Sequence, residues 1–284
     1  AYDSVGGGGG RIAVVVTNDT SFGALALQTY GDVGYFGRGA AAGTVYKESV
    51  SHPAGQGILI IDNNNQAVRW ARTVIPTNQP LSAFGSIVVT NQGVLGFAPG
   101  STFNFGSMPN FALCGPNHTF ITVRNLSGIT FPSPFTIDGY TLRLDADLTA
   151  TSSWTIATNG SLSHSWNEAS ADIDLHLRLN GNLTVDGTVD VRASGYPQQT
   201  GPGSSTGGGS HGGLGAEAPT NKCYGSILNP IQLGSSATYI SGGGAVHLDI
   251  TGNTVVNGNI LAGCLPIDNF DASGGSLYLR TGTL

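Results

Sequence analysis

Apolar and polar residues alternate in several short segments of this sequence. The clearest examples are residues 140–148, 171–179, 182–185, 188–192 and 245–250. Successive side chains of a β-strand point to opposite faces, so an alternating segment presents one apolar and one polar face. Leu142 and Leu144 fall on the apolar face of their segment, and Arg143 and Asp145 fall on the polar face. These segments are predicted to be strands with one buried side.

The alternation also predicts the core. Every second residue of such a strand should point inward and stack on equivalent residues of neighbouring strands. The predicted inward residues are Ile12, Val14, Val16, Leu142, Leu144, Ile173, Leu175, Leu177, Val189, Val191, Val246, Leu248, Ile250, Leu277 and Leu279.

Bends are marked by dipeptides that end in glycine, each followed closely by an apolar pair. They occur at residues 159–162, 180–183, 186–189, 257–260 and 281–284. Asn-Gly and Asp-Gly favour hairpin turns, which would predict a sandwich or a barrel. The same dipeptides also suit the corners between parallel strands, because Asn and Gly tolerate the left-handed backbone conformation.

A long-range repeat favours the parallel arrangement. Gly-Gly-Gly-Arg-Ile-Ala-Val at residues 8–14 matches Gly-Gly-Gly-Ala-Val-His-Leu at 242–248, and Gly-Thr-Val-Tyr at 43–46 matches Gly-Ser-Leu-Tyr at 275–278. Self-similarity of this kind is typical of solenoids. We therefore predict an all-β, single-domain right-handed parallel β-helix (β-solenoid) over residues 1–284, with about 12 coils rising ~4.8 Å each.

Two segments depart from the strand pattern. Residues 97–134 contain five prolines and are predicted to be rich in loops. Residues 201–215 are rich in Gly and Ser and are predicted to be a flexible loop. The second segment has no Lys and no helix pattern after it, which argues against a phosphate-binding loop.

Composition excludes several classes of protein. With 44 Gly and only 10% charged residues, the chain lacks the Glu, Lys and Arg that solvent-facing helices use. Its apolar runs are far shorter than the ~18 residues of a membrane span. Because 11 Lys and Arg stand against 17 Asp and Glu without a basic cluster, we expect no nucleic-acid partner. The first residue is Ala1 and the single methionine is Met108, so we expect a processed chain or a piece of a longer one.

The glycine-led segments resemble those of very large secreted β-helix proteins. The resemblance is carried by residues 6–14, 42–46, 57–63 and 274–284, about a third of the chain, whereas residues 76–200 match only in style. Those proteins look like adhesins or surface fibres. The resemblance implies an extracellular or cell-surface location and a mainly structural role, and it carries over no functional residue.

The acidic strands are the candidates for chemistry. Asp172, Asp174 and His176 share one face by alternation, as do Asp145 and Asp147. Carboxylates close enough to interact could serve as acid and base on a polysaccharide, or Asp145, Asp147, Asp172 and Asp174 could bind calcium. Arg143 and Arg178 lie on the same faces, so a solvated ladder of opposite charges explains these residues without function.

Cysteines and glycosylation motifs add weaker candidates. Among Cys114, Cys223 and Cys264, a bridge between Cys223 and Cys264 is the favoured pairing, although each thiol could also be a buried apolar group. If the source is eukaryotic, glycans could be attached at Asn18, Asn117, Asn125, Asn159 and Asn182, although five such motifs are close to the number expected by chance.

Three functional hypotheses remain. The first is an extracellular structural protein without catalysis or cofactor, a filament or surface-fibre subunit that stacks head to tail with copies of itself. The second is an adhesin that binds glycans or a host surface. The third is a polysaccharide lyase or hydrolase that uses the face of Asp172 and Asp174.

Overall fold

The computed structural model describes most of the chain and divides it into two compact units. The described residues are 6–33, 39–66, 68, 71–79, 84–98, 100–105, 111–113, 120–124, 128–167, 173–216, 218, 222–265 and 271–284. Unit 1 comprises Ala1–Pro132 with Gly139–Thr141, and unit 2 comprises Ser133–Asp138 with Leu142–Leu284. All regular elements in the described part are strands, and no helix there is long and apolar enough to cross a membrane.

Unit 1 contains short strands in three groups. Its strands are β1 (Arg11–Val16), β2 (Thr44–Ser49), β3 (Ile58–Asp62), β4 (Thr73–Ile75), β5 (Ser86–Thr90), β6 (Val94–Phe97), β7 (Phe103–Asn104), β8 (Phe111–Leu113), β9 (Phe120–Val123) and β10 (Ile129–Thr130). The strands β1-β2-β3-β5-β8 form a sheet in that order, in which β2 and β3 are antiparallel and the other pairs are parallel. The strands β4, β6 and β9 pair in parallel, and so do β7 and β10.

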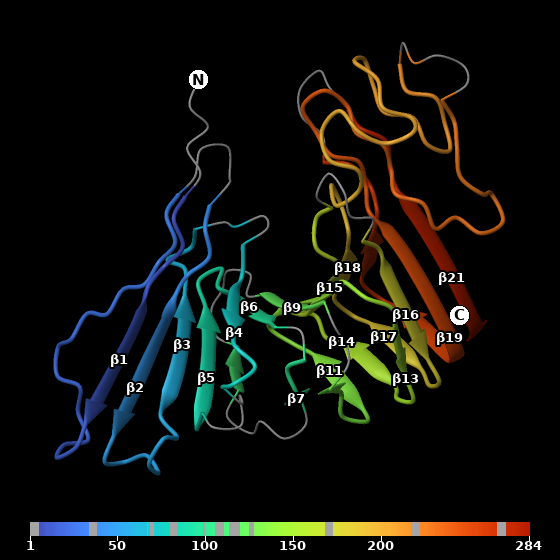
Figure 1. Ribbon diagram of the computed structural model, residues 1–284. Coiled ribbons are helices and arrows are strands. Elements are labelled where there is room, and N and C mark those ends of the chain that lie inside the picture. The colour runs from blue at the N-terminus through green and yellow to red at the C-terminus, as the bar shows by residue number, and fades with distance from the viewer. Residues whose placement is uncertain are drawn as a thin grey trace. The chain divides into compact units, whose positions relative to one another are not determined.

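Unit 2 consists of parallel ladders. Its strands are β11 (Phe135–Ile137), β12 (Thr141–Leu144, from Leu142 onward), β13 (Leu148–Ala150), β14 (Trp154–Ile156), β15 (Ser161–Ser163), β16 (Leu175–Leu179), β17 (Leu183–Val185), β18 (Thr188–Asp190), β19 (Ala245–Val256), β20 (Asn259–Leu261) and β21 (Ser276–Thr283). The strands β12, β15, β18 and β20 lie in that order, and β13, β16, β19 and β21 form a second ladder. Figure 1 shows β16, β19 and β21 side by side.

The long strand β19 joins two ladders of unit 2. Residues 246–250 of β19 pair with β16, and residues 254–256 pair with β17, which continues through β14 to β11. The register of β19 against β21 shifts between Ile250 and Asn253. Such an irregularity lets one strand bend and serve two sheets.

Columns of apolar side chains form the core of unit 2. Leu175, Val246 and Leu277 occupy equivalent positions on β16, β19 and β21. The first two are fully buried, whereas Leu277 is 43% exposed, because among the described residues no strand follows β21 in the ladder. The prediction of inward residues is confirmed for Leu142, Leu144, Leu175, Leu177, Val189, Val191, Val246, Leu248 and Ile250. Ile12, Val14, Val16, Ile173 and Leu279 are only partly buried.

The sequence repeat corresponds to a repeated local structure. The first copy forms the parallel pair β1 and β2, with Arg11 opposite Thr44, and the second forms β19 and β21, with Ala245 opposite Ser276. A Cβ at Gly43 would overlap the backbone of Gly10. A Cβ at Gly275 in the second copy would overlap the backbone of Gly244 in the same way, so in both copies two backbones lie too close together for a side chain.

The predicted single right-handed parallel β-helix of about 12 coils is wrong, although the all-β class is confirmed. The strands form several separate sheets, and β2 and β3 are antiparallel. Paired residues are also unevenly spaced along the chain: Trp154 pairs with Phe135 and with Leu183, while Leu183 pairs with Thr254. Alternation and bend dipeptides specify strands and turns, but they do not specify which strands pair.

The described residues of the glycine-rich region between β18 and β19 form no strand, yet hydrogen bonds hold them in place. The amide of Ser210 donates to Gly203 O over 2.9 Å, and that of Gly209 donates to Asp271 O over 3.1 Å. The prediction of a flexible loop at residues 201–215 thus missed a backbone network, in which small residues allow segments to approach one another. The loop-rich segment 97–134, where described, contains the short strands β7, β8, β9 and β10.

We expect the position within the column to determine the cost of truncation. Leu175→Ala should lower the free energy of unfolding by about 3 kcal/mol, because it leaves a cavity among side chains that are themselves buried. Leu277→Ala, the same change in the same column, should cost less than about 1 kcal/mol, because its side chain is partly in water. Urea unfolding followed by circular dichroism measures both. Equal costs would contradict the assignment of β21 as the uncovered end.

Candidate functional site

The outer face of the ladder β13-β16-β19-β21 gathers several polar side chains of unit 2. The register pairs His176 with His247 and His247 with Tyr278. Asp147 directly precedes β13 and lies beside His176. We call these four residues the histidine row. Parallel pairing without offset stacks like positions of successive strands directly beside one another, which brings together residues far apart in the sequence.

The rings of the histidine row contact one another closely. The imidazoles of His176 and His247 stack with centroids 4.1 Å apart and planes 7° apart, and Tyr278 meets His247 edge-on at 4.8 Å. His176 Nδ1 lies 3.0 Å from an Asp147 carboxylate oxygen. Burial, followed by the neighbouring His176, lowers the pKa of His247, so the stack favours neutral imidazole there.

A second row carries the charges. Arg178, Asp249 and Arg280 are in register on β16, β19 and β21. Arg280 donates two hydrogen bonds to the Asp249 carboxylate, over 2.9 Å from Nε and 2.8 Å from Nη2. Of the residues in the predicted ladder of opposite charges, only Arg178 lies in this row, where it is exposed. Exposed pairs of this kind contribute little stability individually.

Arg143 and Asp145 do not belong to that ladder, contrary to the prediction. Arg143 is only 6% exposed, and its guanidinium lies 5.1 Å from the Trp166 ring. The Asp145 carboxylate accepts the amide of Ser165 over 2.7 Å. Residues 163–167 therefore cover the face of β12 that alternation had assigned to water. Burial lowers the pKa of Arg143 to about 10, opposed by the nearby Asp145 carboxylate, and Arg143 remains charged at neutral pH.

His164 is buried beside this pair. Its Nδ1 donates to Ser165 O over 2.7 Å, while its buried Nε2 has no hydrogen-bond partner among the described residues. Burial lowers the pKa of His164 to about 4, an effect that the Ser165 carbonyl and Asp145 partly oppose. The imidazole is thus neutral at physiological pH.

The predicted acidic site is only partly assembled. Asp147 and His176 meet, but Asp145 is bound to Ser165, so the carboxylates of Asp145 and Asp147 have different partners. Asp174 is half-buried directly before β16, and Asp172 lies outside the described residues. Within the described ranges, no three His, Cys, Asp or Glu residues are grouped so that they could hold a metal ion.

The arrangement of His176 limits what it could do chemically. Its Nδ1 faces Asp147, and its Nε2 is buried without a hydrogen-bond partner in the described part of unit 2. A general base must reach the proton of its substrate within hydrogen-bonding distance. In this structure the His176 imidazole is thus engaged by Asp147 at Nδ1 and stacked on His247.

The remaining candidates are dispersed. Cys223 and Cys264 are free thiols, so the bridge expected between them is not formed, and Cys114 lies outside the described residues. Among the glycosylation candidates, Asn18, Asn159 and Asn182 are exposed, whereas Asn117 and Asn125 lie outside the described residues.

Sequence reasoning missed the participation of His247, Tyr278 and Asp249. The only signal was alternation within residues 245–250 and the repeat at 274–284, which indicated outward positions but not their neighbours. Comparisons of the chain with models of protein families, with curated proteins and with solved structures found no match. The site must therefore be interpreted from its own geometry.

We expect His164 to make stability depend on pH. The unfolded chain binds a proton near the ordinary pKa of 6.5 and the folded chain only near 4, so its neutral form contributes fully above 6.5. That contribution, roughly 3 kcal/mol, is lost as the pH falls toward 4.

The matched variant is His164→Asn, which keeps a donor for Ser165 O but does not titrate. Unfolding free energies measured from pH 7 to pH 4 should fall less steeply for this variant than for the wild type. Identical slopes would show that His164 is not the titrating group.

Proposed function

We propose that this chain is a non-catalytic structural protein of the cell exterior, and that copies of it associate through the open edges of its sheets. The observation that carries the proposal is the uncovered end of the column in unit 2. Leu175 and Val246 are fully buried, but Leu277 at the equivalent position of β21 is 43% exposed. An added layer would complete this column.

The backbone of β21 supports the same proposal. This strand runs over eight residues, Ser276–Thr283, and pairs with β19 on one side. On its other side no described strand pairs with it. An exposed strand edge offers unpaired N–H and C=O groups to another chain. Among the described strands of unit 1, β1 likewise lies at the edge of its sheet, and its Val15 is 55% exposed. Two open edges on one chain allow association to continue beyond a pair.

The geometry of the histidine row favours a structural over a catalytic role. Catalysis on polysaccharides commonly uses two carboxylates that converge on one bond. Here Asp147 is held by His176 and Asp145 by the amide of Ser165. Rows of stacked rings and charges instead reinforce the pairing of successive strands. The extracellular location rests on the resemblance of the glycine-led segments to those of secreted surface proteins.

The test is a charge placed at the uncovered end. Leu277→Lys should weaken self-association at least about tenfold, because an incoming apolar layer would have to bury an ammonium group. The control is Leu25→Lys, the same change at a leucine of unit 1 that is 53% exposed and outside any strand. Sedimentation velocity over a range of concentrations, with electron microscopy of the associated material, measures the effect.

Two results would contradict the proposal. One is a wild-type chain that stays monomeric at high micromolar concentration. The other is association that Leu277→Lys and Leu25→Lys leave equally strong. Circular dichroism of both variants verifies that the fold is intact.

A further inference from the structure

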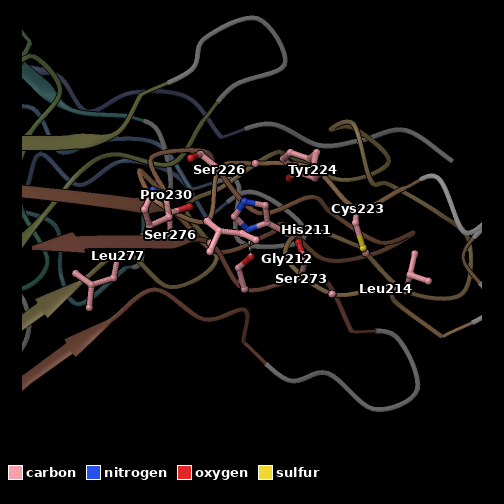
Figure 2. Close-up of a pocket in the computed structure, with 16 residues that line it drawn as sticks. His211, Gly212, Leu214, Cys223, Tyr224, Ser226, Pro230, Ser273, Ser276 and Leu277 are labelled. Carbon is pink, nitrogen blue, oxygen red and sulfur yellow. Dashed lines mark hydrogen bonds between the residues drawn. The ribbon is translucent and has the colours of Figure 1, made fainter.

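A cavity of about 710 Å³ lies in unit 2 beside the start of β21. Three segments line it, around residues 209–214, 223–230 and 273–277, and Figure 2 shows their side chains around His211. Leu277, the uncovered end of the core column, is one of the lining residues. The cavity is therefore continuous with the edge proposed above for association.

Hydrogen bonds and ring contacts fix the walls of this cavity. His211 Nδ1 donates to Gly274 O over 3.1 Å, and its ring lies 4.7 Å from that of Tyr224. The Tyr224 hydroxyl donates to Leu233 O over 2.5 Å, and burial raises the pKa of Tyr224 to about 12. These contacts hold the His211 and Tyr224 rings in place, so little ordering of this wall would be required on binding.

The lining is uncharged. It includes the apolar side chains of Leu214, Ile227 and Leu277, which are 49%, 96% and 43% exposed, and no Asp, Glu, Lys or Arg. An ionic group would lose its hydration there without gaining a charged partner. The chemistry fits an apolar side chain of another protein chain.

The glycines that line the cavity differ in the space around them. At Gly209 and Gly275 an added Cβ would overlap neighbouring backbone, so packing explains these glycines. At Gly212, Gly213 and Gly274 an added Cβ would meet nothing within 4 Å, and all three line the cavity. Side chains at these positions would fit the fold but would fill the cavity.

A highly exposed apolar residue stands next in sequence to the lining of the same cavity. Leu228 directly follows the lining residue Ile227 and is 89% exposed. We call the exposed Leu228 side chain the knob and the neighbouring cavity the socket. A patch that bears both can bind a second copy of itself across a two-fold axis, with each knob in the partner's socket.

We propose that two copies of this chain pair through this patch, with Leu228 of each copy inserted into the cavity of the other. The inference rests on the proposed self-association at the β21 end and specifies its geometry. It replaces the head-to-tail contact expected at this end by a two-fold contact. The edge strand β1 of unit 1 remains available for further association.

The experiment uses one variant for each half of the contact. Leu228→Ser removes the knob, and Gly213→Val fills the socket at a position where a Cβ has room. Each should raise the dissociation constant of the pair at least about tenfold, because burial of a leucine side chain is lost. The matched control is Gly263→Val, which also has room for a Cβ but lies outside the cavity, and it should associate like the wild type.

Mixing the two defective variants tests reciprocity. A Leu228→Ser copy keeps its socket and a Gly213→Val copy keeps its knob, so a mixed pair retains one of the two contacts. Mass photometry should detect mixed pairs at concentrations where neither variant pairs alone. Cys223 lines the cavity and is exposed, so its alkylation should slow as the wild type associates, with Cys264 as the internal reference.

The outcomes separate the two proposals. A monomeric wild type overturns association itself and this inference with it. If the wild type associates, and Leu228→Ser and Gly213→Val associate as strongly as Gly263→Val, then only the insertion of Leu228 into the cavity is overturned. The two-fold contact is also overturned if both variants are impaired but their mixture forms no mixed pairs. It is overturned as well if the wild type assembles through this patch into more than two copies.

Discussion

Close approach of one backbone to the next is the constraint on which the rest of this structure depends. Where parallel strands begin beside one another, the two backbones lie too close together to leave room for a side chain. A Cβ at Gly43 would overlap the carbonyl of Gly10, one at Gly275 that of Gly244, and one at Gly258 that of Gly187. Only glycine fits such close approaches. They hold neighbouring strands in register, and the register in turn creates the apolar columns and the histidine row.

Much of the strand pattern of unit 2 could be predicted from the sequence, because alternation is a local property. Leu175 and Leu177 are buried as expected, and Arg178 is exposed. Pairing is not local: Leu175 lies beside Val246, with the whole glycine-rich region between them in sequence. The β-helix prediction failed at this level, since a repeated bend is compatible with several ways of pairing the strands.

The candidate site shows the same difference between the local strand pattern, which the sequence predicts, and the pairing of strands, which it does not. Alternation placed Asp147 and His176 outward, but only pairing brings them to 3.0 Å and adds His247 and Tyr278. Arg143 shows the opposite failure, since a loop covers the face that the pattern assigned to water. Alternation with a period of two residues distinguishes the two faces of a strand. It carries no information about which segment of the chain covers the polar face.

The uncovered end of the core column shows why an open edge follows from this architecture. Stacking in register buries each apolar layer beneath the next, so the last layer is always incomplete. In unit 2 that layer is β21, where Leu277 is exposed and a fixed, uncharged cavity adjoins it. Monomeric proteins usually blunt such edges with charges, prolines or a covering loop. The exposed apolar side chains of Ile227 and Leu228 do the reverse, because they extend the uncovered apolar surface, and this is the surface that the proposed association would bury.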